Sequence, residues 1–337
     1  MHNSAKTGAA AACVMATLFT DPICLGGAPG QAGPPSFKSG TEVVALNVSV
    51  TDRRGQAVLG LGRGDFAVYE DGVPQHVTFF GDGTVPIDLV LLIDTSSSML
   101  DKLPIVRKAA LGFVSALRQG DRASVVAFSD VVHVLQALTE DLESLRGSLP
   151  LLHANGGTAL YTALYVTLTG LTKRDAVTRQ TRRSSVVVLT DGEDSRSLTA
   201  LDDLERVARL ANVVVYPISV ISSHAADEFK KDGRKRFLGR FEYALGAVAR
   251  ETGGRAFFPI VINDLSGIYD DIAQELSTQY LLGYETTKVT PDSVYRKILV
   301  QIPTRPDARP RTRTGYYAGQ SGPPAMSASE AARLPSR

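Results

Sequence analysis

Different hydrophobic patterns divide the chain of 337 residues into blocks. In the block 41–82, apolar residues alternate with polar or small ones from Val44 to Val50, which predicts a strand with one buried face. Phe66–Tyr69 and His76–Phe80 flank Asp71-Gly72, a pair that favours a tight turn, and together they predict a hairpin. This block is therefore expected to form a small antiparallel β module.

The second block, about 86–262, alternates continuous apolar runs with segments of helical spacing. The runs Ile87–Ile93, Val186–Leu189 and Val213–Val220 are typical of strands buried on both faces of a parallel sheet. The other elements predicted in this block are the helices Val106–Leu117, Leu142–Leu152, Ala159–Leu171, Leu201–Ala211 and Leu238–Glu251 and the strands Ser124–Phe128, Val131–Leu135 and Ala256–Ile260. This order predicts an α/β fold with a doubly wound, mostly parallel sheet, whose binding sites lie at the carboxyl ends of the strands.

A third block begins with a predicted helix at Leu265–Gln279. Strand-like segments follow at Tyr280–Tyr284, Arg296–Ile302 and Arg313–Tyr317. Neither flanking β block has enough strands for a stable sheet of its own. We therefore expect the strands of 280–317 to pair with those of 41–82, with an α/β domain at 84–279 inserted between them.

The two ends of the chain differ from these blocks. An apolar run, Gly8–Phe19, follows Lys6 and is about as long as the core of a signal peptide, so residues 1–32 are expected to be an export leader; the alternative is a disordered N-terminal extension. Residues 318–337 are rich in Ser, Pro, Gly and Ala and are expected to be a disordered tail. No stretch is apolar over the length needed to span a membrane. These features predict an extracytoplasmic protein, periplasmic or secreted.

Composition excludes several classes of function. The chain has 36 Lys and Arg against 35 Asp and Glu, which gives no overall attraction to nucleic acid. The only cysteines are Cys13 and Cys24, so the main body has neither a cysteine-ligated metal site nor a cysteine nucleophile. The five histidines show no pair at metal-ligand spacing.

Polar residues gather where the buried strands end. Asp94, Ser96 and Ser98 follow the first apolar run, Asp191 follows the second, and Thr158 lies in a loop before a predicted helix. Because the carboxyl ends of parallel strands meet at one edge of a sheet, these two carboxylates and three hydroxyls should lie together. Such hard oxygen donors suit Mg²⁺ or Mn²⁺ rather than zinc. The alternative is that the same residues are only turn and cap residues.

The order Asp94-x-Ser96-x-Ser98, then Thr158, then Asp191 is similar to the metal-ion-dependent adhesion site of von Willebrand factor type A (VWFA) domains. Stretches such as DFAVYEDGVPQ, GDRASVVAFSD and QYLLGYE resemble the VWFA-related family of acidobacterial type, exported bacterial proteins, over roughly 41–317. The resemblance implies that Ser96, Ser98 and Thr158 bind the ion directly, while Asp94 and Asp191 hold it through water. Because hydroxyl ligands are neutral, the ion would also take an Asp or Glu from a partner protein.

A basic segment follows the third apolar run and is expected at the same edge of the sheet. It contains Lys230, Lys231, Arg234, Lys235 and Arg236, which we interpret as a partner-binding patch. The alternative is a solvated charged loop.

Together these features predict a non-enzymatic extracytoplasmic binding module that recognises an acidic group on a protein through a Mg²⁺-bridged contact. One alternative is a Mg²⁺-dependent hydrolase that uses the same site. Another is an intracellular adaptor of an ATPase complex. The sequence indicates neither a nucleic-acid partner nor a particular oligomeric state.

Overall fold

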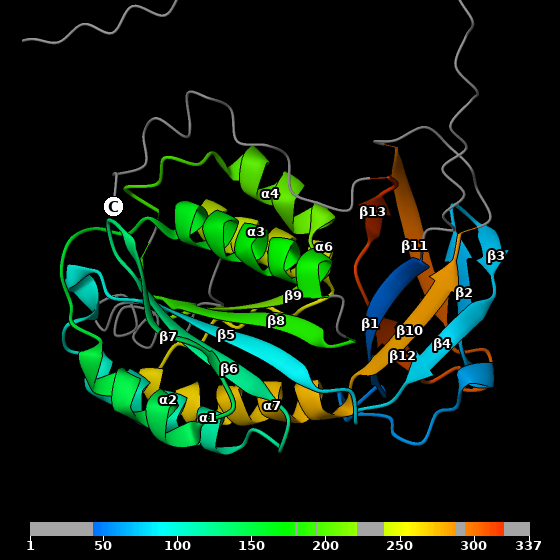
Figure 1. Cartoon of the computed structure of the whole chain (residues 1–337), viewed down its shortest axis with the longest axis horizontal. Coiled ribbons are helices and arrows are strands. Elements are labelled where there is room, and N and C mark those ends of the chain that lie inside the picture. Colours follow the sequence, from blue (N-terminus) through cyan, green and yellow to red (C-terminus); the bar gives the residue numbers. More distant parts are fainter. Residues whose placement is uncertain (1–42, 179–180, 193, 221–238, 287–293, 320–337) are drawn as a thin grey trace, which may run out of the picture. The chain divides into compact units, whose positions relative to one another are not determined.

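Five strands form a central sheet in the order β7-β6-β5-β8-β9 (Figure 1). The computed structural model describes residues 43–178, 181–192, 194–220, 239–286 and 294–319, which all belong to the unit Thr41–Arg337. Four strands are parallel and β7 is antiparallel to β6. All eight residues of β5 are buried, as its continuous apolar run predicts. The strands are β5 (Ile87–Asp94), β6 (Arg122–Phe128), β7 (Val132–Thr139), β8 (Arg183–Thr190) and β9 (Val213–Ser219).

Helices cover both faces of this sheet (Figure 1). Leu89, Leu91 and Ile93 of β5 pack on the side of α1, α2 and α7, whereas Val90 and Leu92 pack on the side of α3, α4 and α6, so alternate side chains of one strand supply two cores. The helices are α1 (Leu103–Ser115), α2 (Leu142–Ser148), α3 (Leu160–Thr178), α4 (Leu201–Leu210), α6 (Arg240–Thr252) and α7 (Leu265–Thr278), with short 3₁₀ helices at Arg63–Asp65, Ser97–Met99, Leu149–Leu151 and Ile262–Asp264.

The remaining strands form two antiparallel sheets of four strands, β12-β1-β10-β4 and β13-β11-β2-β3. Val44 of β1 faces Tyr284 of β10, and Ile298 of β11 faces Glu70 of β2. Strands that precede the central sheet in the sequence therefore pair with strands that follow it. A third apolar core is shared by these two sheets. The strands are β1 (Val43–Thr51), β2 (Ala67–Glu70), β3 (Val73–Gln75), β4 (Val77–Gly81), β10 (Tyr280–Glu285), β11 (Tyr295–Gln301), β12 (Arg309–Arg311) and β13 (Gly315–Tyr317).

The sequence-based hairpin prediction had the turn right and the partner wrong. Asp71 and Gly72 have positive φ angles of 47° and 79°, as a two-residue hairpin turn requires. So tight a turn brings β2 directly against β3. The predicted partner segment becomes β4, which crosses to the other sheet and pairs with β10.

Two further elements of the α/β block differ from the prediction. Ala256–Ile260 is not a strand, because only an isolated bridge joins Phe257 to Ile218. The helix predicted to reach Leu152 ends at Ser148 and continues as a 3₁₀ turn around Pro150, whose ring nitrogen has no hydrogen to donate. Both differences lie outside the buried strands that position the site.

A buried polar cluster joins α7 to the antiparallel sheets. The Oε1 atom of Glu275 on α7 accepts hydrogen bonds from Ser49 Oγ of β1 at 2.9 Å and Tyr216 OH of β9 at 2.7 Å, and it pairs with Arg311 of β12. The Nε2 atom of Gln279 donates to Ser49 Oγ at 3.0 Å. This cluster fixes the end of α7 where the chain enters β10.

Candidate metal centre

Two acidic residues lie at the carboxyl ends of neighbouring central strands. Asp94 is the last residue of β5 and is fully buried, while Asp191 follows the last residue of β8. Asp94 Oδ1 accepts a hydrogen bond from the backbone N–H of Ser96 at 2.7 Å, and its Oδ2 accepts one from Thr190 Oγ1 at 2.6 Å. Both carboxylate oxygens are therefore held in place by neighbouring backbone and side-chain donors.

The serine hydroxyls connect the loop after β5 to the loop after β8. Ser96 Oγ lies 3.0 Å from Ser98 Oγ, and Ser98 Oγ donates to Asp191 Oδ1 at 2.7 Å. With the Ser96 N–H bond to Asp94, four of the five residues predicted from the sequence form one hydrogen-bonded chain.

Thr158, the fifth residue, is positioned by the loop after β8. Its carbonyl oxygen accepts hydrogen bonds from the backbone N–H groups of Ser195 and Arg196 at 2.9 and 3.0 Å, and its own N–H donates to Ser195 Oγ at 3.2 Å. A Cβ atom placed on Gly192 would lie 3.6 Å from Thr158 Oγ1. The Thr158 hydroxyl therefore lies beside the residue that follows Asp191.

Backbone hydrogen bonds fix the loops that carry these ligands. The N–H of Thr95 donates to the carbonyl oxygen of Phe128 at 2.7 Å. The carbonyl oxygen of Thr95 in turn accepts a hydrogen bond from the N–H of Asn155 at 2.7 Å. The N–H of Ser97 donates to the carbonyl oxygen of Gly156 at 3.1 Å. These bonds tie the loop that leads to Thr158 to the loop after β5.

The environment of Asp94 favours a nearby cation. Burial raises the pKa of its carboxyl, hydrogen bonds from Thr190 and Ser96 oppose that rise, and the charge of Asp191 adds to it; the net pKa lies above the ordinary value. An ionised Asp94 is therefore electrostatically costly in the folded chain unless a positive charge lies close to it.

Sequence reasoning missed a positive charge at this site, the ammonium group of Lys102, which lies on Asp191. The Nζ atom of Lys102 donates to the carbonyl oxygen of Ser98 at 3.1 Å and to Asp191 Oδ2. Its side chain is 15% exposed and that of Asp191 is 1% exposed, so the pair is largely shielded from water. No signal in the sequence singled it out, because a lysine just before a helix is ordinarily a solvated side chain.

The oxygen set fits a small hard cation. Adjacent ligand oxygens of an octahedral Mg²⁺ ion, each about 2.0–2.1 Å from it, lie about 3 Å apart, which is close to the Ser96–Ser98 hydroxyl separation. In the part of the chain that the structure describes, no three or more His, Cys, Asp or Glu residues group as a metal site. The predicted ligands are two carboxylates and three hydroxyls, a combination that suits Mg²⁺ or Mn²⁺.

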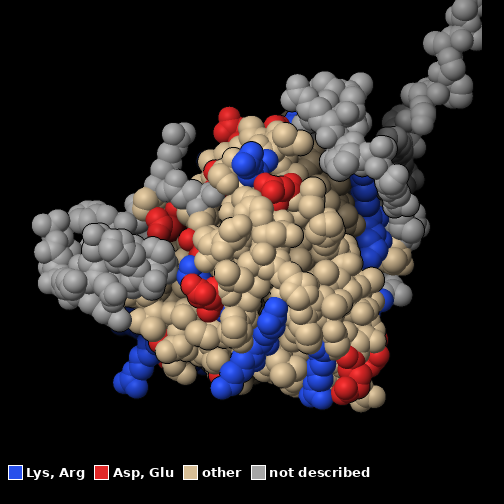
Figure 2. Space-filling view, turned by 90° about the vertical axis from the view of Figure 1, so that its left-hand side faces the viewer, with Lys and Arg blue, Asp and Glu red and all other residues tan. Residues whose placement is uncertain are grey.

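Other regions named from the sequence can be placed only in part. The basic segment Lys230–Arg236 lies outside the described residues, as do the predicted leader, 1–32, and residues 320–337 of the predicted tail. The carboxyl ends of the central strands lie on the left in Figure 1, and the described residues visible from that side show scattered charges of both signs and no extended patch of one sign (Figure 2). Within the described ranges, no helix is both long and apolar enough to cross a membrane.

The chain is similar to proteins with a von Willebrand factor type A domain. An uncharacterized protein of Borreliella burgdorferi is 25% identical over 226 residues, which are 64% of this chain and 61% of that protein, so this chain spans less than two thirds of its length. A von Willebrand factor type A structure from Catenulispora acidiphila is 12% identical, with a TM-score of 0.43 over 85% of this chain and 77% of that one. Proximal thread matrix protein 1 from the mussel byssus, in a structure with a zinc-occupied MIDAS motif, is 16% identical, with a TM-score of 0.45 over 61% of this chain and 49% of that one.

The family model for the von Willebrand factor type A domain matches residues 88–237. This range includes β5 and β8 and the loops that carry all five predicted ligands. The chain therefore contains a von Willebrand factor type A domain.

Proposed function

We propose that this protein is a binding module that holds Mg²⁺, or Mn²⁺, at Asp94, Ser96, Ser98, Thr158 and Asp191 and uses the ion to bind an acidic side chain of a partner protein. The observation that supports this proposal is the hydrogen-bonded chain from Asp94 through both serines to Asp191. In it, the Ser98 hydroxyl lies 3.0 Å from that of Ser96 and 2.7 Å from Asp191 Oδ1, close to the separations of ligand oxygens on one small cation. A cap or turn role would not require hydroxyls of one loop to meet the carboxylate of another.

The ligand chemistry explains why an acidic partner is expected. Ser96, Ser98 and Thr158 would offer neutral hydroxyl oxygens directly, while Asp94 and Asp191 would act through water. Neutral direct ligands leave most of the double positive charge uncompensated, so a bound ion supplies an electrophilic position for an Asp or Glu carboxylate. Ser98 is exposed and therefore lies where such a carboxylate could approach.

We propose a binding role rather than catalysis, since hydrolysis would need a group that activates water beyond the metal ligands. No third His, Cys, Asp or Glu joins the two carboxylates in a metal-holding group among the described residues. The proposal includes an extracytoplasmic location, which is based on the leader predicted at residues 1–32; an N-terminal sequence of the mature protein that still contains this leader would contradict it.

The test is a calorimetric titration of the purified protein with MgCl₂ and with MnCl₂, followed by melting curves with and without EDTA. We expect saturable binding and a metal-dependent rise in melting temperature, because an ion that binds only the folded state stabilises it. Ser96→Ala and Thr158→Ala should weaken both responses. The matched control is Ser97→Ala, whose hydroxyl donates to the carbonyl oxygen of Gly156 rather than to the candidate site.

Partner binding is tested separately by affinity capture in Mg²⁺ and in EDTA. We expect capture in Mg²⁺ to be lost in EDTA and with Thr158→Ala, but kept with Ser97→Ala. The absence of any calorimetric or thermal response to either ion would refute the metal site. A metal response together with EDTA-insensitive capture would refute only the bridging role.

A further inference from the structure

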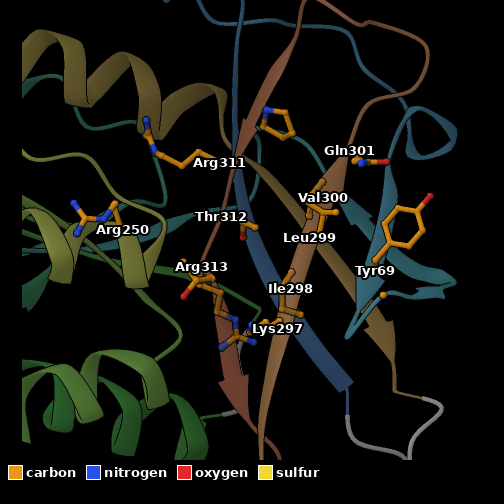
Figure 3. Close-up of a pocket in the computed structure, with 13 residues that line it drawn as sticks. Tyr69, Arg250, Lys297, Ile298, Leu299, Val300, Gln301, Arg311, Thr312 and Arg313 are labelled. Atoms are coloured by element: carbon orange, nitrogen blue, oxygen red, sulfur yellow. The ribbon is translucent and has the colours of Figure 1, made fainter.

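A groove lies in the antiparallel sheets, away from the candidate metal centre. Its volume is about 720 Å³, within the range of about 300–1,000 Å³ typical of ligand sites. One wall is β11, and the other is the segment 310–314, which connects β12 to β13 (Figure 3). Arg250 of α6 and Tyr69 of β2 also contribute to the lining.

The groove exists because one strand leaves its partner. β13 pairs with β11 only from Tyr295 to Lys297, and the Ile298 N–H still donates to the carbonyl oxygen of Thr314 at 2.9 Å. The segment then turns into β12, which pairs with β1 in the other sheet. Beyond Ile298, this edge of β11 is therefore not hydrogen-bonded to a neighbouring strand, although β12 passes close to it.

The free edge offers backbone hydrogen-bonding groups. Because the Ile298 N–H points to this side, strand alternation directs the N–H and C=O of Leu299 toward β2 and those of Val300 into the groove. Val300 makes no backbone hydrogen bond with the opposite wall. These backbone groups favour a ligand that supplies hydrogen bonds, because a polar group that is covered without gaining a partner is costly.

The charges of the lining residues are all of one sign. Arg250, Lys297, Arg311 and Arg313 line the groove, and no acidic residue does. Arg311 is already engaged by Glu275, and the Arg250 guanidinium points away from the groove in Figure 3, whereas Lys297 and Arg313 line it from its two walls. The Lys297 side chain is exposed, so its charge is available to an acidic ligand.

Apolar surface completes the site. Leu299 is 53% exposed and faces the half-buried Tyr69 of the neighbouring strand. A ligand that binds here can therefore bury apolar side chains while its acidic groups meet Lys297.

We propose that the groove binds an extended acidic segment of another protein, which adds as a strand to the free edge of β11 at Val300. In such a strand successive side chains point to opposite sides, so acidic residues can face Lys297 while apolar ones pack near Leu299. The site does not depend on the metal centre. The chain's own segment 320–337 is a poor match, since it carries one glutamate and two arginines.

The probe is a fluorescein-labelled eight-residue peptide of alternating valine and glutamate, titrated with the full chain in EDTA so that a metal-bridged contact cannot contribute. We expect saturable anisotropy that weakens with salt, no binding of the valine–lysine peptide, and a roughly tenfold loss of affinity in Lys297→Glu. The matched control is Lys108→Glu, an exposed lysine on α1 that does not line the groove and should leave affinity unchanged.

Hydrogen exchange gives a second readout, because strand addition should protect the Val300 amide when the valine–glutamate peptide binds. Charged residues at a free edge can also serve only to prevent aggregation. Absence of binding in EDTA, equal losses in Lys297→Glu and Lys108→Glu, or an unprotected Val300 amide would overturn the proposal. Binding that appears only after residues 320–337 are deleted would also overturn it, since that segment would then be the occupant.

Discussion

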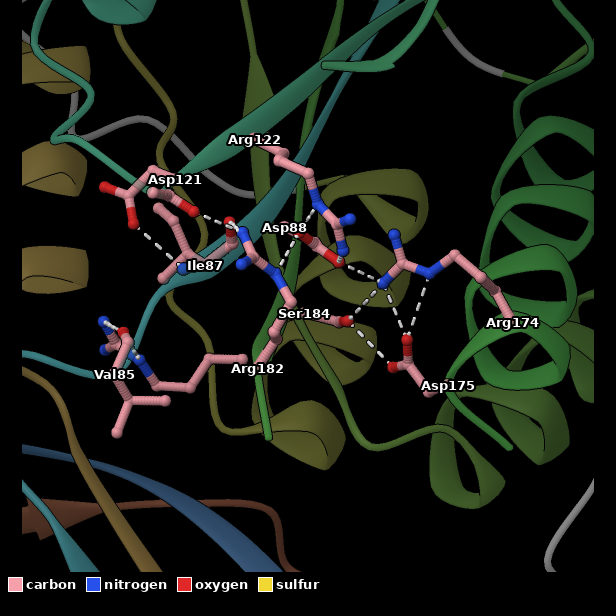
Figure 4. A network of polar contacts seen from close by, with 11 residues as sticks. Val85, Ile87, Asp88, Asp121, Arg122, Arg174, Asp175, Arg182 and Ser184 are labelled. Carbon is pink, nitrogen blue, oxygen red and sulfur yellow. Dashed lines mark hydrogen bonds and ion pairs between the residues drawn. The ribbon is translucent and has the colours of Figure 1, made fainter. Parts of the chain in front are cut away.

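The most informative substitution for the stability of the central domain is Asp88→Asn. Asp88 is fully buried at the start of β5, and three arginines converge on its carboxylate (Figure 4). Its Oδ1 accepts from Arg122 Nε at 2.8 Å and Arg182 Nε at 2.7 Å, while its Oδ2 accepts from Arg122 Nη2 at 2.8 Å and Arg174 Nη2 at 2.5 Å. One carboxylate thus joins β5, β6, α3 and the start of β8.

The expected loss of stability follows from the three arginines that the substitution leaves without a charged partner. An asparagine keeps the shape but removes the charge, and its NH₂ group would face guanidinium donors. Removing one partner of a buried ion pair costs about 3–5 kcal/mol. The arginine side chains are 14–26% exposed, so water can solvate them in part and the lower end, about 3 kcal/mol, is expected. For a domain of this size that loss lowers the melting temperature by about 6–12 °C.

The pKa of Asp88 determines how the stability difference between wild type and Asp88→Asn depends on pH. Burial alone would raise the pKa of Asp88, but the hydrogen bonds from Arg122 and Arg182 and the charge of Arg174 outweigh it, so the pKa is lowered. A carboxyl whose pKa is lower in the folded state stabilises that state above its unfolded pKa of about 3.9, and this stabilisation disappears as the pH falls through the folded pKa. The difference between wild type and Asp88→Asn should therefore be constant near neutral pH and shrink below about pH 4.

Denaturant unfolding and calorimetry over this pH range provide the assay. The matched control is Asp175→Asn, which removes a 36% exposed partner of Arg174 and should cost less than about 1 kcal/mol. The reasoning fails if the two variants lose equal stability, or if the deficit of Asp88→Asn does not shrink in acid.

Three further substitutions test the site and its support. Lys102→Met removes the ammonium group held by Asp191, and with it the repulsion between this group and a bound Mg²⁺ ion. Because nearby unit charges interact by about 1 kcal/mol in water and more when shielded, calorimetry should show Mg²⁺ binding about 5–30 times more tightly. An unchanged or weaker affinity would contradict this. Asp94→Ala should abolish the metal-dependent rise in melting temperature. In the metal-free protein it should cost less stability than Asp88→Asn, because it also removes a carboxylate that Asp191 repels. A larger loss without metal would indicate a packing role for Asp94. Glu275→Gln should lower the free energy of unfolding by about 1–3 kcal/mol, because hydrogen bonds from Ser49, Tyr216 and Arg311 lose their charged acceptor. Unchanged unfolding curves would argue against a structural role for the polar cluster around Glu275.

The central strands were predicted well from the sequence because strands buried on both faces have a simple pattern, a continuous run of apolar residues. A run such as Ile87–Ile93 has no polar face, which suits only a strand covered on both sides. Strand partners were harder, since the alternation in 41–82 gives each strand a buried face but does not say which strand lies beside it. Partners far apart in sequence left no pattern at all, as with Asp88 and its three arginines.

The candidate ligands followed the same logic. Asp94 and Asp191 were predictable because each lies at the carboxyl end of a strand of the central sheet, and parallel strands end at a common edge. Lys102 was not, since a lysine at the start of a helix is ordinarily a solvated side chain. Only the folded chain shows that its ammonium group turns back to Asp191.

The hydrogen bonds around the site suggest what a metal ion would change there. The backbone on both sides of the ligands is already fixed, through the bonds of Thr95 to Phe128 and of Ser97 to Gly156. A site with preorganised ligands loses little conformational entropy when it binds. The principal change on loading would then be electrostatic, because a divalent ion would be placed near the charge that Lys102 already brings to Asp191. On this argument affinity for the ion depends more on the charge at position 102 than on loop order, so Lys102→Met should alter metal affinity without altering amide exchange in the metal-free loops.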